Sequence, residues 1–187
     1  MLKLLSDQRV DIVITGGTLD KDYHPLQGEL VFPTKDQPSH VEAILREANV
    51  GAVNDQSGKF TLHNLMQIDS LEMKAAQRKQ IAEAILQCTS QHIVITHGTD
   101  TMVKTAKKLI QWIDDKKEFT ALTDKTIVLT GAMRPFALGD SDASFNLGAA
   151  LIAAQTLPAG VYICMNGNVH RGNEVIKDYQ QGIFVCA

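Results

Sequence analysis

The stretch Ile93-Val94-Ile95-Thr96-His97-Gly98-Thr99-Asp100-Thr101 places a short run of β-branched residues directly before a loop of glycine and hydroxyl side chains. An earlier stretch, Ile12-Val13-Ile14-Thr15-Gly16-Gly17-Thr18, repeats this arrangement. Short β-branched runs are typical of buried strands. In an open parallel sheet, ligands bind at the loops that follow the carboxyl ends of the strands. The two loops therefore predict one active site that uses threonine hydroxyls.

Strand-like and helix-like segments alternate along the chain, which indicates a parallel sheet covered by helices. We expect strands at residues 10–14, 60–68, 93–96, 126–130 and 161–165, with 60–68 as an inner strand. We expect helices at residues 41–48, 73–86, 101–113 and 142–154. The fold class predicted is a three-layer α/β/α arrangement with a mainly parallel, Rossmann-like sheet, in one domain over residues 1–187.

Two segments fall outside this alternation. Residues Leu26–Phe32 look extended and are expected to form a hairpin or a lid. The tail that begins at Asn166 is expected to be irregular.

Composition excludes several classes of function. The 18 Lys and Arg residues and 21 Asp and Glu residues are interspersed, without the basic stripe of a nucleic-acid binder. No apolar run approaches membrane length, and the apolar start Met1–Leu5 is too short for a secretory signal. The three cysteines, Cys88, Cys164 and Cys186, form no CxxC pair. We therefore expect a cytoplasmic protein without nucleic-acid or membrane partners.

Each loop residue also has a purely structural interpretation. Gly16-Gly17 is either a tight turn or a place where backbone approaches a ligand closely. Thr99 or Asp100 either caps the helix that begins near Thr101 or belongs to a site. His97 has no second His or Cys at metal-ligand spacing, so we expect it to position the loop, with no metal ion bound.

Four motifs, taken together, resemble the N-terminal domain of the bacterial-type L-asparaginases. They are Thr15-Gly16-Gly17-Thr18, His97-Gly98-Thr99-Asp100-Thr101-Met102, Gly131-Ala132-Met133-Arg134-Pro135, and Asp142 with Phe145-Asn146-Leu147. The second motif is the most specific, and the order and spacing of all four agree with that family. The resemblance spans residues 10–184 and implies an amidohydrolase, with L-asparagine as the leading substrate and no cofactor.

The resemblance also implies the catalytic residues. Thr18 corresponds to the family nucleophile, and Thr99, Asp100 and Lys177 correspond to a second polar triad. A partly buried lysine can exchange a proton with Thr99 or with a bound water. Tyr23 is the candidate for the lid tyrosine that assists Thr18, although it follows Thr18 more closely than in full-length relatives.

The same resemblance implies the substrate contacts. Gly17 and Gly98 bring backbone amides to the ligand, and Ser70 matches the serine that binds the substrate carboxylate. Asp100 holds the substrate ammonium group, and Thr99 adds a contact of its own. Ser70 has a structural alternative as the N-cap of the helix that follows it.

The sequence departs from the family in two respects. Leu71 stands where the family often has Gln, and the chain ends where the second, C-terminal domain of full-length relatives would begin. That domain supplies a Glu which binds the substrate amino group. Two alternatives therefore stay open: an amino-acid-binding or regulatory module with little hydrolysis, and an amidase for another small amide. Because family sites lie at subunit interfaces, we expect a homo-oligomer, dimeric or larger.

Overall fold

The computed structural model describes residues 8–34, 37–50, 58–115 and 118–187, so the apolar start Met1–Leu5 lies outside the described residues. Within this part of the chain, the main sheet has six strands in the order β4-β1-β5-β6-β7-β8. The strands are β1 (Val10–Gly16), β4 (Phe60–Ile68), β5 (His92–Thr96), β6 (Thr126–Thr130), β7 (Gly160–Met165) and β8 (Asn168–Arg171). All neighbours are parallel except β7 and β8, which confirms a mainly parallel sheet.

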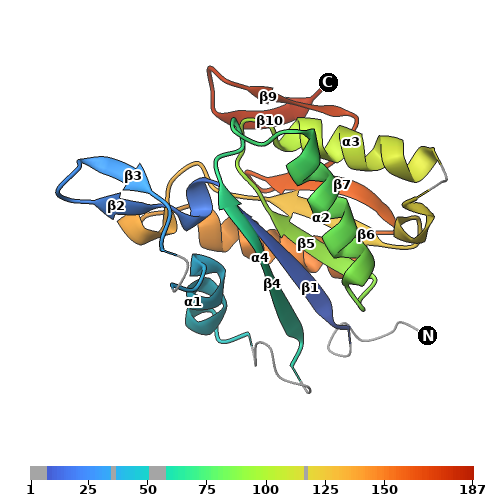
Figure 1. Cartoon of the computed structure of the whole chain (residues 1–187), viewed down its shortest axis with the longest axis horizontal. Coiled ribbons are helices and arrows are strands. Elements are labelled where there is room, and N and C mark those ends of the chain that lie inside the picture. The colour runs from blue at the N-terminus through green and yellow to red at the C-terminus, as the bar shows by residue number, and fades with distance from the viewer. Residues whose placement is uncertain (1–7, 35–36, 51–57, 116–117) are drawn as a thin grey trace.

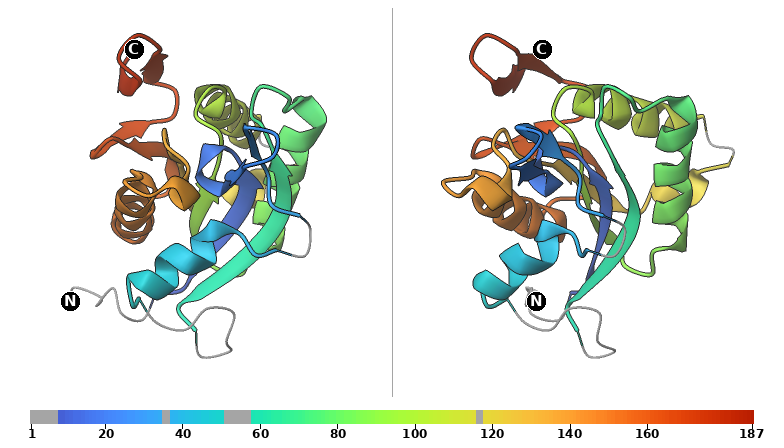
Figure 2. Two further views of the ribbon diagram at one scale, coloured as in Figure 1. Left: turned by 90° about the vertical axis from the view of Figure 1, so that its left-hand side faces the viewer. Right: turned by 60° about the vertical axis from the view of Figure 1, so that its left-hand side comes forward.

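Helices cover both faces of this sheet (Figures 1 and 2). They are α1 (His40–Glu47), α2 (Ala75–Gln87), α3 (Met102–Asp114) and α4 (Ala143–Thr156). Side chains of a strand alternate between faces, so Ile12 and Ile14 pack with α1 and α4 while Val13 packs with α2 and α3. The two apolar cores lie on opposite sides of the sheet, which confirms the three-layer α/β/α arrangement.

The central strands β5 and β6 are buried along almost their whole length. Strands covered on both faces read as continuous apolar runs, as both of these do. Among the residues that the structure describes, none of the helices combines the length and apolar character needed to cross a lipid bilayer.

Two expectations about strands were wrong. Residues 60–68 form β4, but β4 is an edge strand with mostly half-buried side chains, and not an inner strand. The tail after Asn166 is not irregular: it forms β8, β9 (Val175–Asp178) and β10 (Ile183–Cys186). Asn166 and Gly167 have φ values of 54° and 76° and make the two-residue turn between β7 and β8. Asn-Gly is a favoured sequence for such a hairpin turn.

Shorter elements connect the strands and helices of the main sheet or follow them. The strands β2 (Asp22–His24) and β3 (Glu29–Val31) form an antiparallel hairpin that projects from the body, which confirms a hairpin in this region (Figure 1). The strands β9 and β10 form a second hairpin next to α3 (Figure 1). The short 3-10 helices are η2 (Thr18–Asp20), η3 (Thr120–Leu122) and η4 (Phe136–Leu138).

Candidate active site

The two threonine loops meet at the carboxyl ends of the neighbouring strands β1 and β5. Gly17 has a φ of 83°, and a Cβ atom on it would lie only 2.4 Å from the backbone nitrogen of Gly98. This close approach explains why glycine is needed at position 17, since any side chain would strain the backbone and collide with the other loop. Thr18 and Thr99, the next residue in each loop, are thereby brought to the same edge of the sheet.

Lys177 joins the second loop from far along the sequence. Its Nζ atom, on β9, donates to Thr99 Oγ1 at 2.8 Å and to Asp100 Oδ1 at 2.5 Å. The Lys177 side chain is only 7% exposed, whereas that of Asp100 is 37% exposed. The N-cap of α3 is Thr101, without a side-chain capping bond. The side chains of Thr99 and Asp100 therefore hold Lys177 and do not cap the helix.

Tyr179 completes the surroundings of Lys177. Its hydroxyl donates to the carbonyl of Asp100 at 3.0 Å, and the Lys177 ammonium lies 5.0 Å from the centre of its ring. A cation at this distance from an aromatic ring is attracted to its face. Sequence reasoning missed Tyr179 because the tail was expected to be irregular.

Ser70 lies buried against the same loop. Its Oγ accepts a hydrogen bond from the Thr101 amide at 3.3 Å, and its carbonyl accepts one from Thr101 Oγ1 at 2.7 Å. A Cβ atom on Gly98 would lie 2.7 Å from Ser70 Oγ, so these two residues are also in close contact. The N-cap of α2 is Lys74, so Ser70 is not the cap of that helix.

The β2–β3 hairpin begins beside Ser70 but leaves Tyr23 apart from Thr18. Tyr23 is 52% exposed, and within the described residues no hydrogen bond links it to Thr18. Lys21 forms an ion pair with Asp69 at 2.7 Å, and this hydrogen bond lowers the pKa of the Asp69 carboxyl. The hairpin is therefore fixed at its base. Leu71, 71% exposed, offers no polar group at the position next to Ser70.

A buried network beneath the site contains a residue that sequence reasoning missed, Arg78. Arg78 is 3% exposed and donates to the Met73 carbonyl, to Thr101 Oγ1 at 2.8 Å and to Thr105 Oγ1 at 3.0 Å. Burial lowers the pKa of its guanidinium. Arg78 thus supports the loop that carries Thr99 and Asp100. The available signal was its position on the helical stripe of Ile81, a stripe that is otherwise apolar.

The Gly131–Pro135 motif braces the His97 loop from the other side. A Cβ atom on Gly131 would lie 2.3 Å from the carbonyl oxygen of His97. Asp142 accepts from the amides of Met133 at 3.0 Å and Arg134 at 3.1 Å, and Asn146 donates to the Gly131 carbonyl at 3.0 Å. The hydrogen bonds of Asp142 and Asn146 therefore fix the backbone conformation of this motif.

Comparison with known proteins places most of the chain in one family. The model of the family "Asparaginase, N-terminal" matches residues 9–183. The chain is 32% identical over 182 residues to a component of the glutamyl-tRNA(Gln) amidotransferase of Methanococcus maripaludis, covering 91% of this chain and 39% of that protein. It is 29% identical over 180 residues to the glutaminase-asparaginase of Acinetobacter glutaminasificans, covering 90% of this chain and 49% of that protein.

Solved structures agree on the fold. The thermostable L-asparaginase from Thermococcus kodakarensis superposes with a TM-score of 0.74 at 24% identity, covering 96% of this chain and 51% of that one. The probable cytoplasmic L-asparaginase from Campylobacter jejuni gives a TM-score of 0.64 at 25% identity, covering 91% and 50%. The chain thus spans half or less of the length of the curated relatives it matches. The chain belongs to the asparaginase family and matches its N-terminal domain.

Proposed function

We propose that this protein hydrolyses a small amide to an acid and ammonia, with L-asparagine as the leading substrate. The observation that carries the proposal is Lys177, which bridges Thr99 Oγ1 and Asp100 Oδ1 next to the Gly17–Thr18 loop. A hydroxyl that accepts a hydrogen bond from a buried lysine can take part in proton transfer. Relatives named asparaginase and glutaminase-asparaginase support the same reaction class.

In this mechanism Thr18 is the nucleophile. Its Oγ1 bonds to the amide carbon, while backbone amides near Gly98 and Thr99 donate to the developing oxyanion. The carbon–nitrogen bond breaks, and the leaving nitrogen takes up the Thr18 proton to depart as ammonia. Water then attacks the acyl-Thr18 ester and passes a proton through Thr99 and Lys177, which restores the Thr18 hydroxyl and releases the acid. The reaction requires no metal or organic cofactor.

The substrate is held by its charged ends. Ser70 Oγ and the backbone amide of Gly98 lie together and offer hydrogen-bond donors to a carboxylate. Gly17 lies against Gly98 and lines the same place, while its own amide donates to the Ile68 carbonyl at 3.2 Å. Asp100, whose side chain is partly exposed, offers a negative charge to an ammonium group. In this proposal Tyr23 moves toward Thr18 when the hairpin closes over the substrate.

Two threonine variants test the mechanism. Thr18→Ala and Thr99→Ala should each lower ammonia release from L-asparagine by about 100-fold or more, because nucleophile and proton transfer are removed. Thr156→Ala is the matched control, since its hydroxyl donates to carbonyls within α4. Wild-type rates in both site variants would rule out the two-threonine mechanism.

Lys177→Met tests the proton-transfer role separately. It should lower kcat more than it raises KM, because Lys177 acts on Thr99 and Asp100 rather than on the substrate. Lys107→Met, at an exposed position of α3, is the control. An unchanged kcat would remove Lys177 from the mechanism.

The substrate is best found by a screen of ammonia release over asparagine, glutamine and small amides lacking the α-amino group. Exposed Leu71 favours the second candidate function, an amidase for another small amide, because it offers no hydrogen bond beside Ser70. Calorimetric binding of aspartate without ammonia release from any amide would instead indicate an amino-acid-binding module.

We propose further that the protein acts in the cytoplasm as a homo-oligomer, dimeric or larger, on a small molecule rather than on nucleic acid. Asp100 and Tyr23 are partly exposed, so one side of the site faces outward where a second copy would close it. Light scattering should give a mass of at least two chains. A mass of one chain together with full activity would contradict the proposal.

A further inference from the structure

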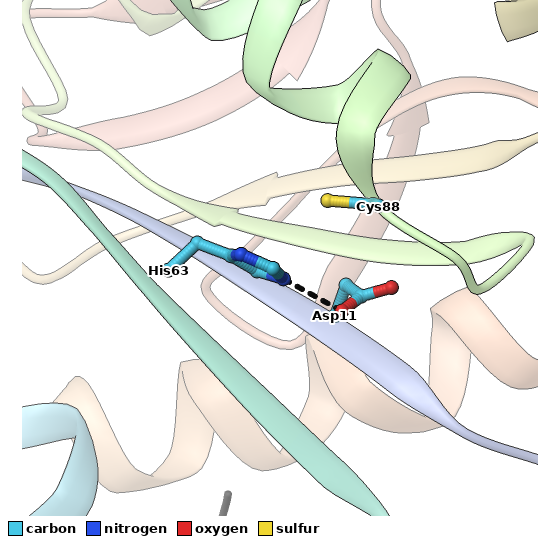
Figure 3. Close-up of side chains that lie close together, drawn as sticks. All are labelled: Asp11, His63 and Cys88. Carbon is cyan, nitrogen blue, oxygen red and sulfur yellow. Dashed lines mark hydrogen bonds and ion pairs between the residues drawn. The ribbon is translucent and has the colours of Figure 1, made fainter.

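Three side chains of different chemistry meet well away from the threonine loops. Asp11 is the second residue of β1, His63 lies on β4, and Cys88 directly follows α2 (Figure 3). His63 Nε2 lies 2.6 Å from Asp11 Oδ1. The carboxylate, imidazole and thiol ligand atoms all lie within 4.8 Å of one another. Asp11 and Thr18 are separated by the length of β1, roughly 20 Å.

A carboxylate oxygen, an imidazole nitrogen and a thiolate sulfur are the three kinds of ligand that zinc takes in proteins. In tetrahedral zinc sites the metal lies about 2.0–2.3 Å from each ligand, so the ligand atoms stand about 3.5 Å apart. The ligand atoms are therefore near the required spacing, and side-chain movements of about 1 Å would bring them to it. We propose that Asp11, His63 and Cys88 bind a divalent cation of the zinc type, with water in the fourth position.

The surroundings hold these ligands in place. Asp11 Oδ2 accepts from the Ser90 amide at 2.8 Å, which leaves Oδ1 directed at His63. Lys125 Nζ donates to the carbonyls of Cys88 at 2.9 Å and Ser90 at 2.6 Å, so it fixes the connection between α2 and β5. The Ser90 amide is a partner of the kind that orients a metal-ligating carboxylate.

Burial favours a metal site over a reactive thiol. Cys88 is 5% exposed and Asp11 is 3% exposed, so a substrate of any size cannot reach the sulfur. The His63 side chain is 33% exposed and gives a small ion a path to the cluster. On binding, the ion replaces the His63–Asp11 hydrogen bond and the Cys88 thiol bond to the Ala84 carbonyl. The displaced protons pass to solvent.

The ion would act on the fold and not on the reaction. It would join β1, β4 and the end of α2 directly, in addition to strand pairing, apolar packing and the hydrogen bond from Ser90 to Asp11. Because the ion binds the native state, the temperature of unfolding should rise with its concentration. The kinetics of ammonia release should stay unchanged, which separates this proposal from that of the active site.

The test uses the full chain, reduced and stripped of metal by a chelator, and titrated with Co²⁺ and then Zn²⁺. We expect one Co²⁺ per chain with a thiolate-to-cobalt charge-transfer band, and displacement of Co²⁺ by Zn²⁺. Cys88→Ser should abolish this band, while Asp11→Asn and His63→Gln should each weaken binding by at least about tenfold. Cys186→Ser is the matched control, since Cys186 is exposed and its sulfur lies 4.0 Å from His170 Nδ1.

A second measurement keeps all three proposed ligands in place. X-ray absorption of the zinc-loaded wild-type chain should show one sulfur neighbour at about 2.3 Å together with nitrogen and oxygen neighbours. Zn²⁺ should also raise the unfolding temperature of the wild type and the Cys186→Ser variant equally. The proposal is overturned if no metal binds at micromolar concentration, if zinc has no sulfur neighbour, or if the cobalt band depends on Cys186.

Discussion

At the scale of single residues, burial keeps the imidazole of His97 neutral in the interior beneath the candidate site. His97 is fully buried, with Nδ1 2.7 Å from the Gly98 carbonyl and Nε2 2.8 Å from Thr105 Oγ1. The carbonyl can only accept, so Nδ1 carries the proton and Nε2 accepts from the Thr105 hydroxyl. Burial lowers the pKa of His97 to about 4, with a further contribution from the charge of Arg78. His97 is therefore neutral and fixes the backbone of Gly98.

This predicts a specific loss of stability in acid. In the unfolded chain the pKa of His97 returns to about 6.5, so the unfolded state binds the proton first as the pH falls. The contribution of His97 is fully present above pH 6.5 and is lost progressively between pH 6.5 and about 4. The loss should reach about 3 kcal/mol of unfolding free energy. Urea unfolding of the wild type at pH 7, 6, 5 and 4.5 measures it.

The variant His97→Gln isolates this effect. It should be less stable at pH 7, but its unfolding free energy should depend less on pH over the same range. His24→Gln, on the β2–β3 hairpin, is the control and should follow the wild type. Equal pH dependence in the wild type and His97→Gln would show that His97 is not held neutral.

Some residues of the candidate site could be predicted from the sequence, and others could not. The grouping of Thr99 and Asp100 with Lys177 was predicted from motifs, and these three side chains do lie in contact. Arg78 was not predicted, because a lone arginine in a helix reads as a solvent-exposed cation. Only the packing of α2 against α3 shows that its guanidinium is buried on Thr101 and Thr105.

At the scale of elements, local patterns predicted the inner strands and helices well. The β-branched runs of β5 and β6 are buried on both faces of the sheet, so these strands could be predicted from their own residues. The position of β4 at the sheet edge could not be read from its residues, since strand order is set by crossovers between distant segments. The β7–β8 hairpin could have been predicted from Asn166-Gly167, a strong turn signal.

The Asp11–His63–Cys88 cluster was beyond sequence reasoning for the same physical reason. Its members lie on three elements and are separated by 52 and 25 positions, unlike the short ligand spacings of familiar zinc motifs. The parallel pairing of β1 with β4, which places Val13 opposite His63, brings two of them together. Tertiary structure therefore creates this site without any local signature.

At the scale of the whole molecule, stability depends on two apolar cores that share one sheet. Ile95 lies on the central strand β5, is fully buried, and packs in the core beneath α2 and α3. Replacing a buried isoleucine by alanine removes apolar contacts and leaves a cavity that a close-packed interior fills only partly. Ile95→Ala should therefore lower the free energy of unfolding by about 2–5 kcal/mol.

Ile176→Ala is the matched control for this prediction, because it makes the same chemical change on β9, where the side chain is 47% exposed. Its effect should stay within about 0.5 kcal/mol, as for most exposed positions. Urea unfolding followed by circular dichroism measures both variants, and an unchanged m-value would show that both unfold as the wild type does. If the two variants lost similar stability, the β9–β10 hairpin would have to contribute to the cooperative core as strongly as β5. Its position beside α3, outside the main sheet, argues against this (Figure 1).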